Sequence, residues 1–461
     1  MIDADIVILG AGPAGMAAAQ TAAEAGANVH LIDEQPTAGG QIYRAIENAG
    51  EQRIALLGPT YRAGAVLVGG LVHDNIHHHP DATIWRVDNN GMVCFSVRQK
   101  AQQIRGRHVI IATGALERAM PIPGWTLPGV FTAGAAQILL KASGVAAEGA
   151  VLAGSGPLLY LVATQLIRAG YPPKALVETQ NYKNYLAASR HIKGASRNLR
   201  SLAEGWFLLR EIRRARIPRY TGARGLRVLG SDQATGISFT SGGQVHQIDS
   251  ETVLLHAGVV PNTQISRSLN LDHLWDKRQY CFSPIVDEWG STSDPLFSVA
   301  GDGGGIGGAK AAAEQGHLAA LFVLVKLELL GIADAQTRSA RHRAILAREL
   351  AIRPFLDALY ATTEDIRLPA DSTVICRCED VTAGEIRAHA KSGCHGPNQA
   401  KAFSRAGMGA CQGRYCGQTV TEILAAENRA SPQRTGAYRI RSPIKPISLG
   451  ELADLDPEKG P

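Results

Sequence analysis

Near its start the chain reads Ile6-Val-Ile-Leu9-Gly10-Ala-Gly12-Pro-Ala-Gly15, an apolar run followed at once by a loop with three glycines. The apolar run predicts a buried strand, and the alanine-rich segment after it predicts a helix that ends at Gly26. With this spacing, the first glycine permits a tight turn, the second lets a pyrophosphate approach the backbone, and the third lets helix and strand pack closely. The positive end of the helix then faces the phosphates. The stretch therefore predicts an α/β fold that binds a dinucleotide.

Two carboxylates, Asp33 and Glu34, follow the next predicted strand, Val29-His-Leu-Ile32. Asp33 is placed to accept hydrogen bonds from a ribose hydroxyl, and its charge would repel a 2′-phosphate. We include Glu34 with it among the candidate contacts of the nucleotide.

The bulk composition bounds the size and class of the protein. At 461 residues, of which 45% are apolar, the chain is long enough for about three domains with full cores. The formal net charge is +6, and the cations form no stripe interleaved with aromatic residues, which disfavours nucleic-acid binding. The apolar run from Leu318 to Ile332 is short and contains Lys326 and Glu328, so it predicts a packed helix and no transmembrane segment. No signal peptide is recognised. We expect a cytoplasmic protein, with peripheral attachment to the inner membrane as the alternative.

A second strand and glycine loop begins at Ala150, with Gly154-Ser-Gly156-Pro-Leu-Leu159. Leu159 stands where a third glycine would be, which predicts a different approach of helix and strand. Glu178, after another predicted strand, is either a ribose ligand or a surface residue. A pyridine nucleotide, an adenine nucleotide and a relic fold without ligand all stay open for this unit.

Four of the seven cysteines form two pairs, Cys376-Arg-Cys378 and Cys411-Gln-Gly-Arg-Tyr-Cys416. A Cys-x-Cys pair does not easily close on itself, and two such pairs can converge on a metal centre. Structural zinc sites usually separate their paired ligands by two to four residues, so the pattern favours a [2Fe–2S] cluster over zinc. Nearby Gly407, Gly409 and Gly417 would let backbone N–H groups approach the sulfurs.

The remaining cysteines and a histidine run are predicted to have structural roles. Cys94 and Cys281 are isolated and predict small buried side chains, and Cys394 predicts a buried residue at a helix end. The run His77-His-His79 precedes Pro80 and predicts a solvated loop. The arginine-rich run from Arg210 to Arg219 predicts a solvated helix face, with a docking surface as the alternative.

Three later segments resemble those of the two-dinucleotide-binding-domain flavoproteins, typified by glutathione and thioredoxin reductases. They are Ala112-Thr113-Gly114, Gly258-Val-Val-Pro261-Asn262 and Gly301-Asp302-Gly303. The resemblance implies FAD, with Asp302 at the ribityl–pyrophosphate region and Gly40 and Gln41 near the flavin. A helix N-cap is the alternative role for Asp302. Those reductases carry a redox cysteine pair that this chain lacks before residue 376, so disulfide reduction is disfavoured.

The expected architecture is α/β, with two Rossmann-like dinucleotide-binding domains of glutathione-reductase type followed by a small helical [2Fe–2S] domain. The last part resembles the bacterioferritin-associated-ferredoxin-like domain, although four residues, where two are more usual, separate its second cysteine pair. The expected boundaries are 1–120 with 257–330 for the FAD domain, 121–256 for the second nucleotide-binding-like domain, 331–370 for a helical connector, 371–428 for the [2Fe–2S] domain and 429–461 for an extended tail.

Over essentially its whole length the chain resembles the α (A) subunit of heteromeric bacterial amine and amino-acid dehydrogenases, the group of octopine and nopaline oxidases, D-hydroxyproline dehydrogenase and hydrogen cyanide synthase. The match is carried by Gly39-Gly-Gln-Ile-Tyr43, Gly154-Ser-Gly-Pro-Leu158 and Arg405-Ala-Gly-Met-Gly409. The resemblance implies a partner β subunit of the D-amino-acid-oxidase type, which carries its own FAD and the substrate pocket. It also implies a respiratory electron acceptor, and it leaves room for FMN at a subunit interface and for a further small subunit.

The resemblance gives this chain the role of electron transfer, without a catalytic acid or base of its own. Two alternatives stay open: a self-contained NAD(P)H-dependent flavin/iron–sulfur reductase, and a non-redox assembly subunit with relic cofactor folds. The expected FAD contacts are Gly10, Gly12, Gly15, Asp33, Glu34, Gly40, Gln41, Thr113, Gly114 and Asp302, and the expected cluster ligands are Cys376, Cys378, Cys411 and Cys416.

Overall fold

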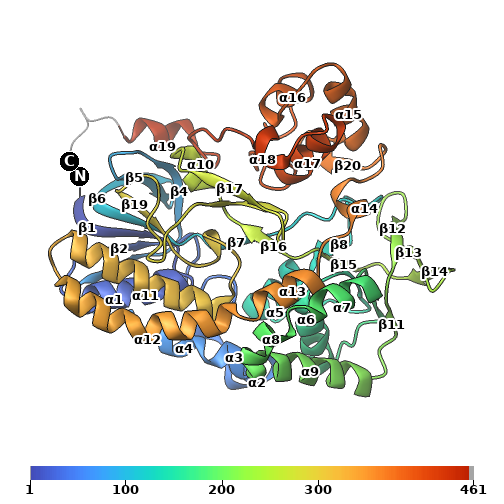
Figure 1. Ribbon diagram of the computed structural model, residues 1–461, viewed down its shortest axis with the longest axis horizontal. Coiled ribbons are helices and arrows are strands. Elements are labelled where there is room, and N and C mark those ends of the chain that lie inside the picture. Colours follow the sequence, from blue (N-terminus) through green and yellow to red (C-terminus); the bar gives the residue numbers. More distant parts are fainter. Residues whose placement is uncertain (1, 456–461) are drawn as a thin grey trace.

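The computed structural model describes residues 2–455 and is built on two sheets, a mixed one whose central strands run parallel and a second, parallel one (Figure 1). In the first, β1 (Ile2–Leu9) lies between β2 (Val29–Ile32) and β6 (Lys100–Ile111), and all three run parallel. β3 (Ile76–His79) extends the sheet beyond β2, and β19 (Phe297–Val299) pairs with the end of β6. The carboxyl ends of these strands therefore meet at one edge, where parallel sheets bind nucleotides.

Helices α1 (Pro13–Glu24) and α11 (Ala309–Lys326) pack against each other below this sheet (Figure 1). Small residues permit their close approach: a Cβ on Gly316 would lie 2.1 Å from the carbonyl oxygen of Ala14. The alanines of α1 are nearly all buried, so its composition reflects tight packing as much as helix propensity. α12 (Ile332–Leu350) lies along the outer side of α11.

The second sheet has the order β11-β10-β9-β15-β8 and is parallel. It carries the second glycine loop between β9 (Val151–Gly154) and α6 (Pro157–Arg168). Its other elements, with the antiparallel ribbon beside it, are β8 (Val130–Thr132), α5 (Ala133–Ser143), β10 (Ala175–Glu178), α7 (Tyr182–Ser189), α8 (Ile192–Ala195), α9 (Leu199–Arg214), β11 (Arg219–Tyr220), β12 (Arg224–Leu229), β13 (Gly236–Ser241), β14 (Gln244–Asp249) and β15 (Val253–His256).

The cysteine-bearing segment forms a separate lobe above the two sheets (Figure 1). It is reached through α13 (Arg353–Leu359) and α14 (Glu364–Arg367), and contains a short ribbon and three helices. These are β20 (Val374–Cys376), β21 (Val381–Thr382), α15 (Ala383–Lys391), α16 (Pro397–Ser404) and α17 (Gly417–Glu427). The chain then returns to the first sheet, where the Ile444 amide donates to the Trp85 carbonyl.

Shorter elements complete the fold. The residues Asn89-Asn90-Gly91 are typical of a hairpin turn, and the strands on either side of them, β4 (Ala82–Val87) and β5 (Met92–Val97), pair antiparallel. The others are α2 (Glu51–Leu57), α3 (Pro59–Arg62), α4 (Gly64–Gly69), β7 (Ala115–Glu117), β16 (Val259–Pro261), α10 (Gln264–Ser268), β17 (His273–Asp276), β18 (Cys281–Pro284), α18 (Pro432–Thr435) and α19 (Leu449–Ala453), with single 3-10 turns at Ile46–Asn48, Ser196–Asn198 and Gly301–Gly303.

Three local predictions need correction or extension. The histidine run is no solvated loop, because His77–His79 lie in β3 and His79 bonds the His30 ring at 2.9 Å. The arginine run is not one helix, since α9 ends at Arg214 and Arg219 lies in β11. The tail is extended apart from two short helices, and residues 456–461 of it lie outside the described part. Across residues 2–455, no helix combines the length and apolar character that a membrane crossing requires.

Candidate functional site

The first glycine loop is closed by contacts that exclude side chains. A Cβ on Gly15 would lie 1.8 Å from the Gly10 carbonyl oxygen, and a Cβ on Gly10 would lie 2.6 Å from that of Ala112. Gly10 also has a φ of +107°, which favours glycine. At Gly12 the nearest atom to a Cβ would be the Gly40 Cα, 3.9 Å away, so this glycine faces open space. The open cradle at Gly12 and the start of α1 fit a pyrophosphate group.

Asp33 lies at the end of β2 beside this loop. Its Oδ2 accepts from the Ala11 amide at 2.6 Å and its Oδ1 from the Gln35 amide at 2.8 Å. Burial raises the pKa of the Asp33 carboxyl, and these two backbone donors oppose that shift. The carboxylate is thus fixed in orientation and keeps lone pairs for a ribose hydroxyl. Glu34 is exposed and forms an ion pair with Lys445 of the tail, so its contact with a cofactor stays a prediction.

The segment containing Gly40 and Gln41 lies against the glycine loop. A Cβ on Gly40 would approach the Gly12 Cα to 2.8 Å, and Gly40 has a φ of +59°. The Gln41 carbonyl accepts from the Lys141 ammonium at 3.0 Å, which ties this segment to α5 of the other sheet. The structure thus brings Gly40 beside Gly12, and the contact of Gly40 and Gln41 with the flavin stays a prediction. Lys141 is a supporting residue that the sequence did not reveal.

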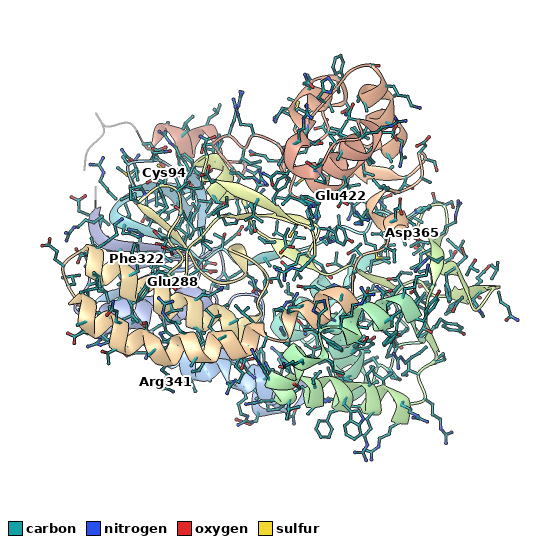
Figure 2. The ribbon with its side chains drawn as sticks, viewed as in Figure 1. Cys94, Glu288, Phe322, Arg341, Asp365 and Glu422 are labelled. Atoms are coloured by element: carbon teal, nitrogen blue, oxygen red, sulfur yellow. The ribbon has the colours of Figure 1, made fainter. Side chains whose placement is uncertain are left out.

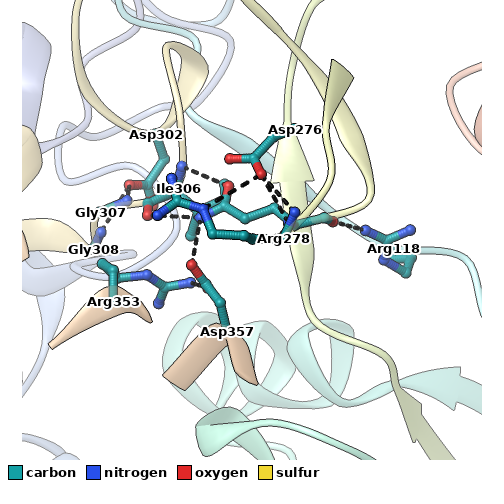
Figure 3. Close-up of polar contacts among 10 residues, drawn as sticks. Arg118, Asp276, Arg278, Asp302, Ile306, Gly307, Gly308, Arg353 and Asp357 are labelled. Carbon is teal, nitrogen blue, oxygen red and sulfur yellow. Dashed lines mark hydrogen bonds and ion pairs between the residues drawn. The ribbon is translucent and has the colours of Figure 1, made fainter. Parts of the chain in front are cut away.

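Thr113, Gly114 and Asp302 lie at the same carboxyl edge. The Asn262 amide donates to the Gly114 carbonyl at 2.9 Å, which joins the two predicted segments. The Oδ1 of Asp302 accepts from the amides of Gly307 and Gly308, both at 2.8 Å, just before α11 begins (Figure 3). Asp302 thus holds the two residues that precede α11, and its contact with the ribityl–pyrophosphate region stays a prediction.

The second nucleotide-binding unit is closed at the position where a ribose would bind. Glu178 is fully buried, and its two carboxylate oxygens accept from Arg219 at 2.9 Å each. Gln180 donates to the same carboxylate at 3.0 Å. Glu178 is therefore not a surface residue, and because it is fully buried a ribose hydroxyl does not reach its remaining lone pairs in this structure. Beside it, the His256 ring fills the space under Gly156, where a Cβ would come within 2.9 Å of the ring.

The four cysteines of the C-terminal lobe come together as two sulfur pairs. Cys376 lies beside Cys416, and Cys378 lies beside Cys411. Within residues 2–455, no group of three or more His, Cys, Asp or Glu side chains is arranged to hold a single metal ion, and no disulfide is formed by the cysteines. Four thiols in two neighbouring pairs are the donor set that a two-iron cluster uses, two thiolates for each iron.

The sulfur of Cys376 is held in an electropositive pocket of backbone amides. The hydrogen bond with Cys416, and then the amides of Gly407, Glu379 and Cys378, lower the pKa of Cys376 to about 6 against the effect of burial. The hydrogen bond with Cys376, and then burial, raise the pKa of Cys416. Amides directed at sulfur are the donors that stabilise a thiolate-bound cluster. The Gly407 amide approaches the Cys376 sulfur as predicted. Gly409 lies against Cys378 and Gly417 against Tyr438, and the approach of their amides to sulfur stays a prediction.

A buried ion-pair cluster attaches the lobe to the rest of the molecule. Glu422 of α17 accepts from Arg367 at 2.6 Å and lies 4.0 Å from Arg118. Figure 2 shows Glu422 on the side of the lobe that faces the two sheets. The guanidinium of Arg118 also donates to the Gln279 carbonyl at 2.5 Å, next to the Asp302 region (Figure 3). These contacts fix the cysteine lobe relative to the flavin-type domain.

The other three cysteines are buried, as predicted. Burial raises the pKa of Cys94 to about 11 and that of Cys281 to about 12, so both remain thiols at neutral pH. Cys394 follows α15, and its carbonyl accepts from Asn428 at 2.9 Å. None of the three contributes to the two sulfur pairs within the described chain.

Two protein families match this arrangement. Residues 4–316 match the pyridine nucleotide-disulphide oxidoreductases, and residues 374–426 match the BFD-like [2Fe-2S] binding domain. L-proline dehydrogenase from P. horikoshii shares the fold over 98% of this chain and 79% of its own, with a TM-score of 0.71 and 19% identity. These features define an α/β flavoprotein oxidoreductase that carries FAD and a [2Fe–2S] cluster.

Relatives that align over nearly the whole chain narrow the class of oxidoreductase. The A subunit of opine oxidase from Agrobacterium tumefaciens (strain Ach5) is 42% identical, over 98% of this chain and 92% of the relative. The HcnB subunit of hydrogen cyanide synthase from Pseudomonas aeruginosa is 31% identical, over 98% of this chain and 99% of the relative. The chain belongs to the family of the opine oxidase A subunits.

Proposed function

We propose that this chain is the electron-transfer subunit of a heteromeric dehydrogenase. A partner subunit with its own FAD, of the D-amino-acid-oxidase type, oxidises a carbon–nitrogen bond of an amine, opine or amino acid to an imine. The two electrons pass to this chain and leave it for a respiratory acceptor. A flavin accepts electrons in pairs, whereas a [2Fe–2S] cluster carries them singly, so the two cofactors together convert one kind of transfer into the other.

The observation that carries the proposal is the occupied ribose position of the second unit. Glu178, the residue that would bind a nicotinamide nucleotide's ribose, is buried and paired with Arg219 on both oxygens. Freeing it from Arg219 would leave a fully buried carboxylate unpaired, which costs about 3 to 5 kcal/mol. A partner protein as electron donor fits this closed unit better than NADH or NADPH does.

The positions of the cysteines also support electron transfer from a partner protein through the flavin to the cluster. In the described part of the chain, no cysteine pair that could reduce a disulfide lies beside the first glycine loop, because Cys94 and Cys281 are isolated and buried. The only paired thiols of the described chain are those of the C-terminal lobe. The lobe is held against the flavin-type domain by Glu422 and two arginines, which supports electron transfer between them.

The existence of a partner chain is supported by the names of the relatives. The opine oxidase and hydrogen cyanide synthase relatives are both named as subunits of larger enzymes. We place the substrate pocket on the partner, so this chain contributes cofactor-binding residues and no catalytic acid or base.

Replacing one cluster ligand tests the proposal. The variant Cys411→Ser in the complex with its partner should lose the visible and EPR signals of the cluster, keep its FAD, and stop transfer to the external acceptor. Cys394→Ala is the matched control, because Cys394 is also buried in the lobe but lies outside the sulfur pairs. Undiminished transfer in Cys411→Ser after loss of the cluster would contradict the proposed route.

A further inference from the structure

Tyr438 lies in the tail, beyond residues 374–426 that match the [2Fe-2S] binding domain, yet its side chain is part of the cysteine site. The residue is 5% exposed. Its ring occupies a slot formed by three glycines of the cysteine loop. A Cβ would approach the Tyr438 ring to 2.6 Å from Gly407, 2.6 Å from Gly413 and 3.0 Å from Gly417. Any larger residue at these positions would collide with the ring.

The backbone on both sides of Tyr438 is held by one side chain. Asn398 of α16 donates from its Nδ2 to the Ala437 carbonyl at 3.0 Å and accepts at its Oδ1 from the Arg439 amide at 2.9 Å. The Lys401 ammonium lies over the ring, 5.7 Å from its centroid. Tyr438 is therefore clamped in place, which a residue of an unspecific tail would not be.

The Tyr438 hydroxyl faces the Cys416 sulfur and bonds no nitrogen or oxygen atom of the described chain. The groups that face it are the sulfurs of Cys416, first, and then Cys376 and Cys411. A buried hydroxyl without a strong partner is costly, so its position calls for a better acceptor than the weakly accepting sulfur of a neutral thiol.

We propose that the Tyr438 hydroxyl donates a hydrogen bond to the Cys416 sulfur when that sulfur is a thiolate ligand of the cluster, and so favours the reduced cluster. The inference rests on the proposed ligand set Cys376, Cys378, Cys411 and Cys416. Reduction adds negative charge to the cluster, and a donor to a ligand sulfur stabilises that charge. Tyr438 thus acts as a positioning and tuning residue, and it binds no iron itself.

The test is an EPR-monitored redox titration of the full chain loaded with its cluster, comparing the parent with Tyr438→Phe. The variant keeps the ring in its glycine slot and removes only the hydroxyl. We expect the ratio of reduced to oxidised cluster at a fixed poise to fall by a factor of about 3 to 10, the size of one hydrogen bond. Tyr415→Phe is the control, because Tyr415 is next to Cys416 in sequence but half exposed, and its ratio should equal that of the parent.

The outcomes separate the inference from its premise. A parent chain without a [2Fe–2S] EPR signal would overturn the ligand set, and with it the proposed function. A loaded Tyr438→Phe variant with an unchanged ratio would overturn the role of the hydroxyl alone. If Tyr438→Phe does not take up the cluster, Tyr438→Trp, whose ring carries an N–H donor, is compared with Tyr438→Leu, which has no donor. An equal ratio of reduced to oxidised cluster in these two variants would also overturn the role of the hydroxyl.

Discussion

Lys141 is a buried cation next to the proposed flavin site, and replacing it with methionine should change how stability depends on pH. Its side chain is 2% exposed, and its ammonium donates to the Gln41 carbonyl at 3.0 Å and to the Gln137 side chain at 2.9 Å. Burial, with the nearby charge of Arg44, lowers the pKa of Lys141 from 10.5 to about 7. In the unfolded chain the pKa returns to its ordinary value near 10.4.

The sign and size of the effect follow from proton linkage. Between pH 7 and pH 10.5 the unfolded chain holds a proton on Lys141 that the folded chain has released, so the parent gains stability as pH rises. The limiting gain is about 1.4 kcal/mol per pH unit, or about 2 to 3 kcal/mol between pH 6.5 and pH 9. Methionine does not titrate, so Lys141→Met lacks this gain. Its stability relative to the parent should therefore fall by that amount as pH rises.

The assay is denaturant unfolding of parent and variant at pH 6.5, 7.5 and 9, followed by a probe of the same cooperative transition. Lys174→Met is the matched control, since Lys174 is exposed and donates to the Asp249 carbonyl. The control's difference from the parent should stay the same at all three pH values. A Lys141→Met difference that is constant, or that grows in the variant's favour with pH, would refute the burial of a titrating ammonium at this position.

Two further variants test the cofactor site and the joint between the lobes. Asp33→Asn places a side-chain N–H against a backbone N–H that bonds a carboxylate oxygen in the parent, and it removes the charge-assisted contact with the ribose. FAD should then bind about 10- to 100-fold more weakly, as measured by flavin fluorescence. The control variant Asp74→Asn, at an exposed position, should bind FAD as the parent does. Equal FAD affinity would remove Asp33 from the site. Glu422→Gln leaves buried Arg118 and half-buried Arg367 without a counter-charge. It should cost about 3 kcal/mol of stability, seen as earlier unfolding of the C-terminal lobe, and an unchanged transition would show that other contacts hold the lobe.

The sequence predicts the parts of the fold that depend on local periodicity and on glycine spacing. The strand, loop and helix around Gly10 to Gly15 follow directly, because a Cβ at Gly10 or Gly15 would collide with backbone atoms. The β-hairpin around Asn89-Asn90-Gly91 follows from its turn residues. The two cysteine pairs are recognisable from spacing alone, and the structure brings their sulfurs together.

What the sequence could not predict depends on partners far away along the chain. The histidine run looks polar, but it forms a strand because β3 pairs with β2 and its rings stack on His30. Glu178 looks available to a ribose in the sequence, but the fold places Arg219 beside it. Lys141 and Tyr438 carry no motif at all: only their burial, and the groups that face them, show what they support.

The central claim is that electrons enter this chain from a partner protein and not from a pyridine nucleotide. The most direct measurement is the anaerobic visible spectrum of the purified chain during addition of NADH and then NADPH. The account predicts flavin and iron–sulfur bands that neither nucleotide bleaches, because the Glu178 carboxylate is already bound by Arg219. Immediate bleaching by either nucleotide would contradict the account and identify a self-contained reductase.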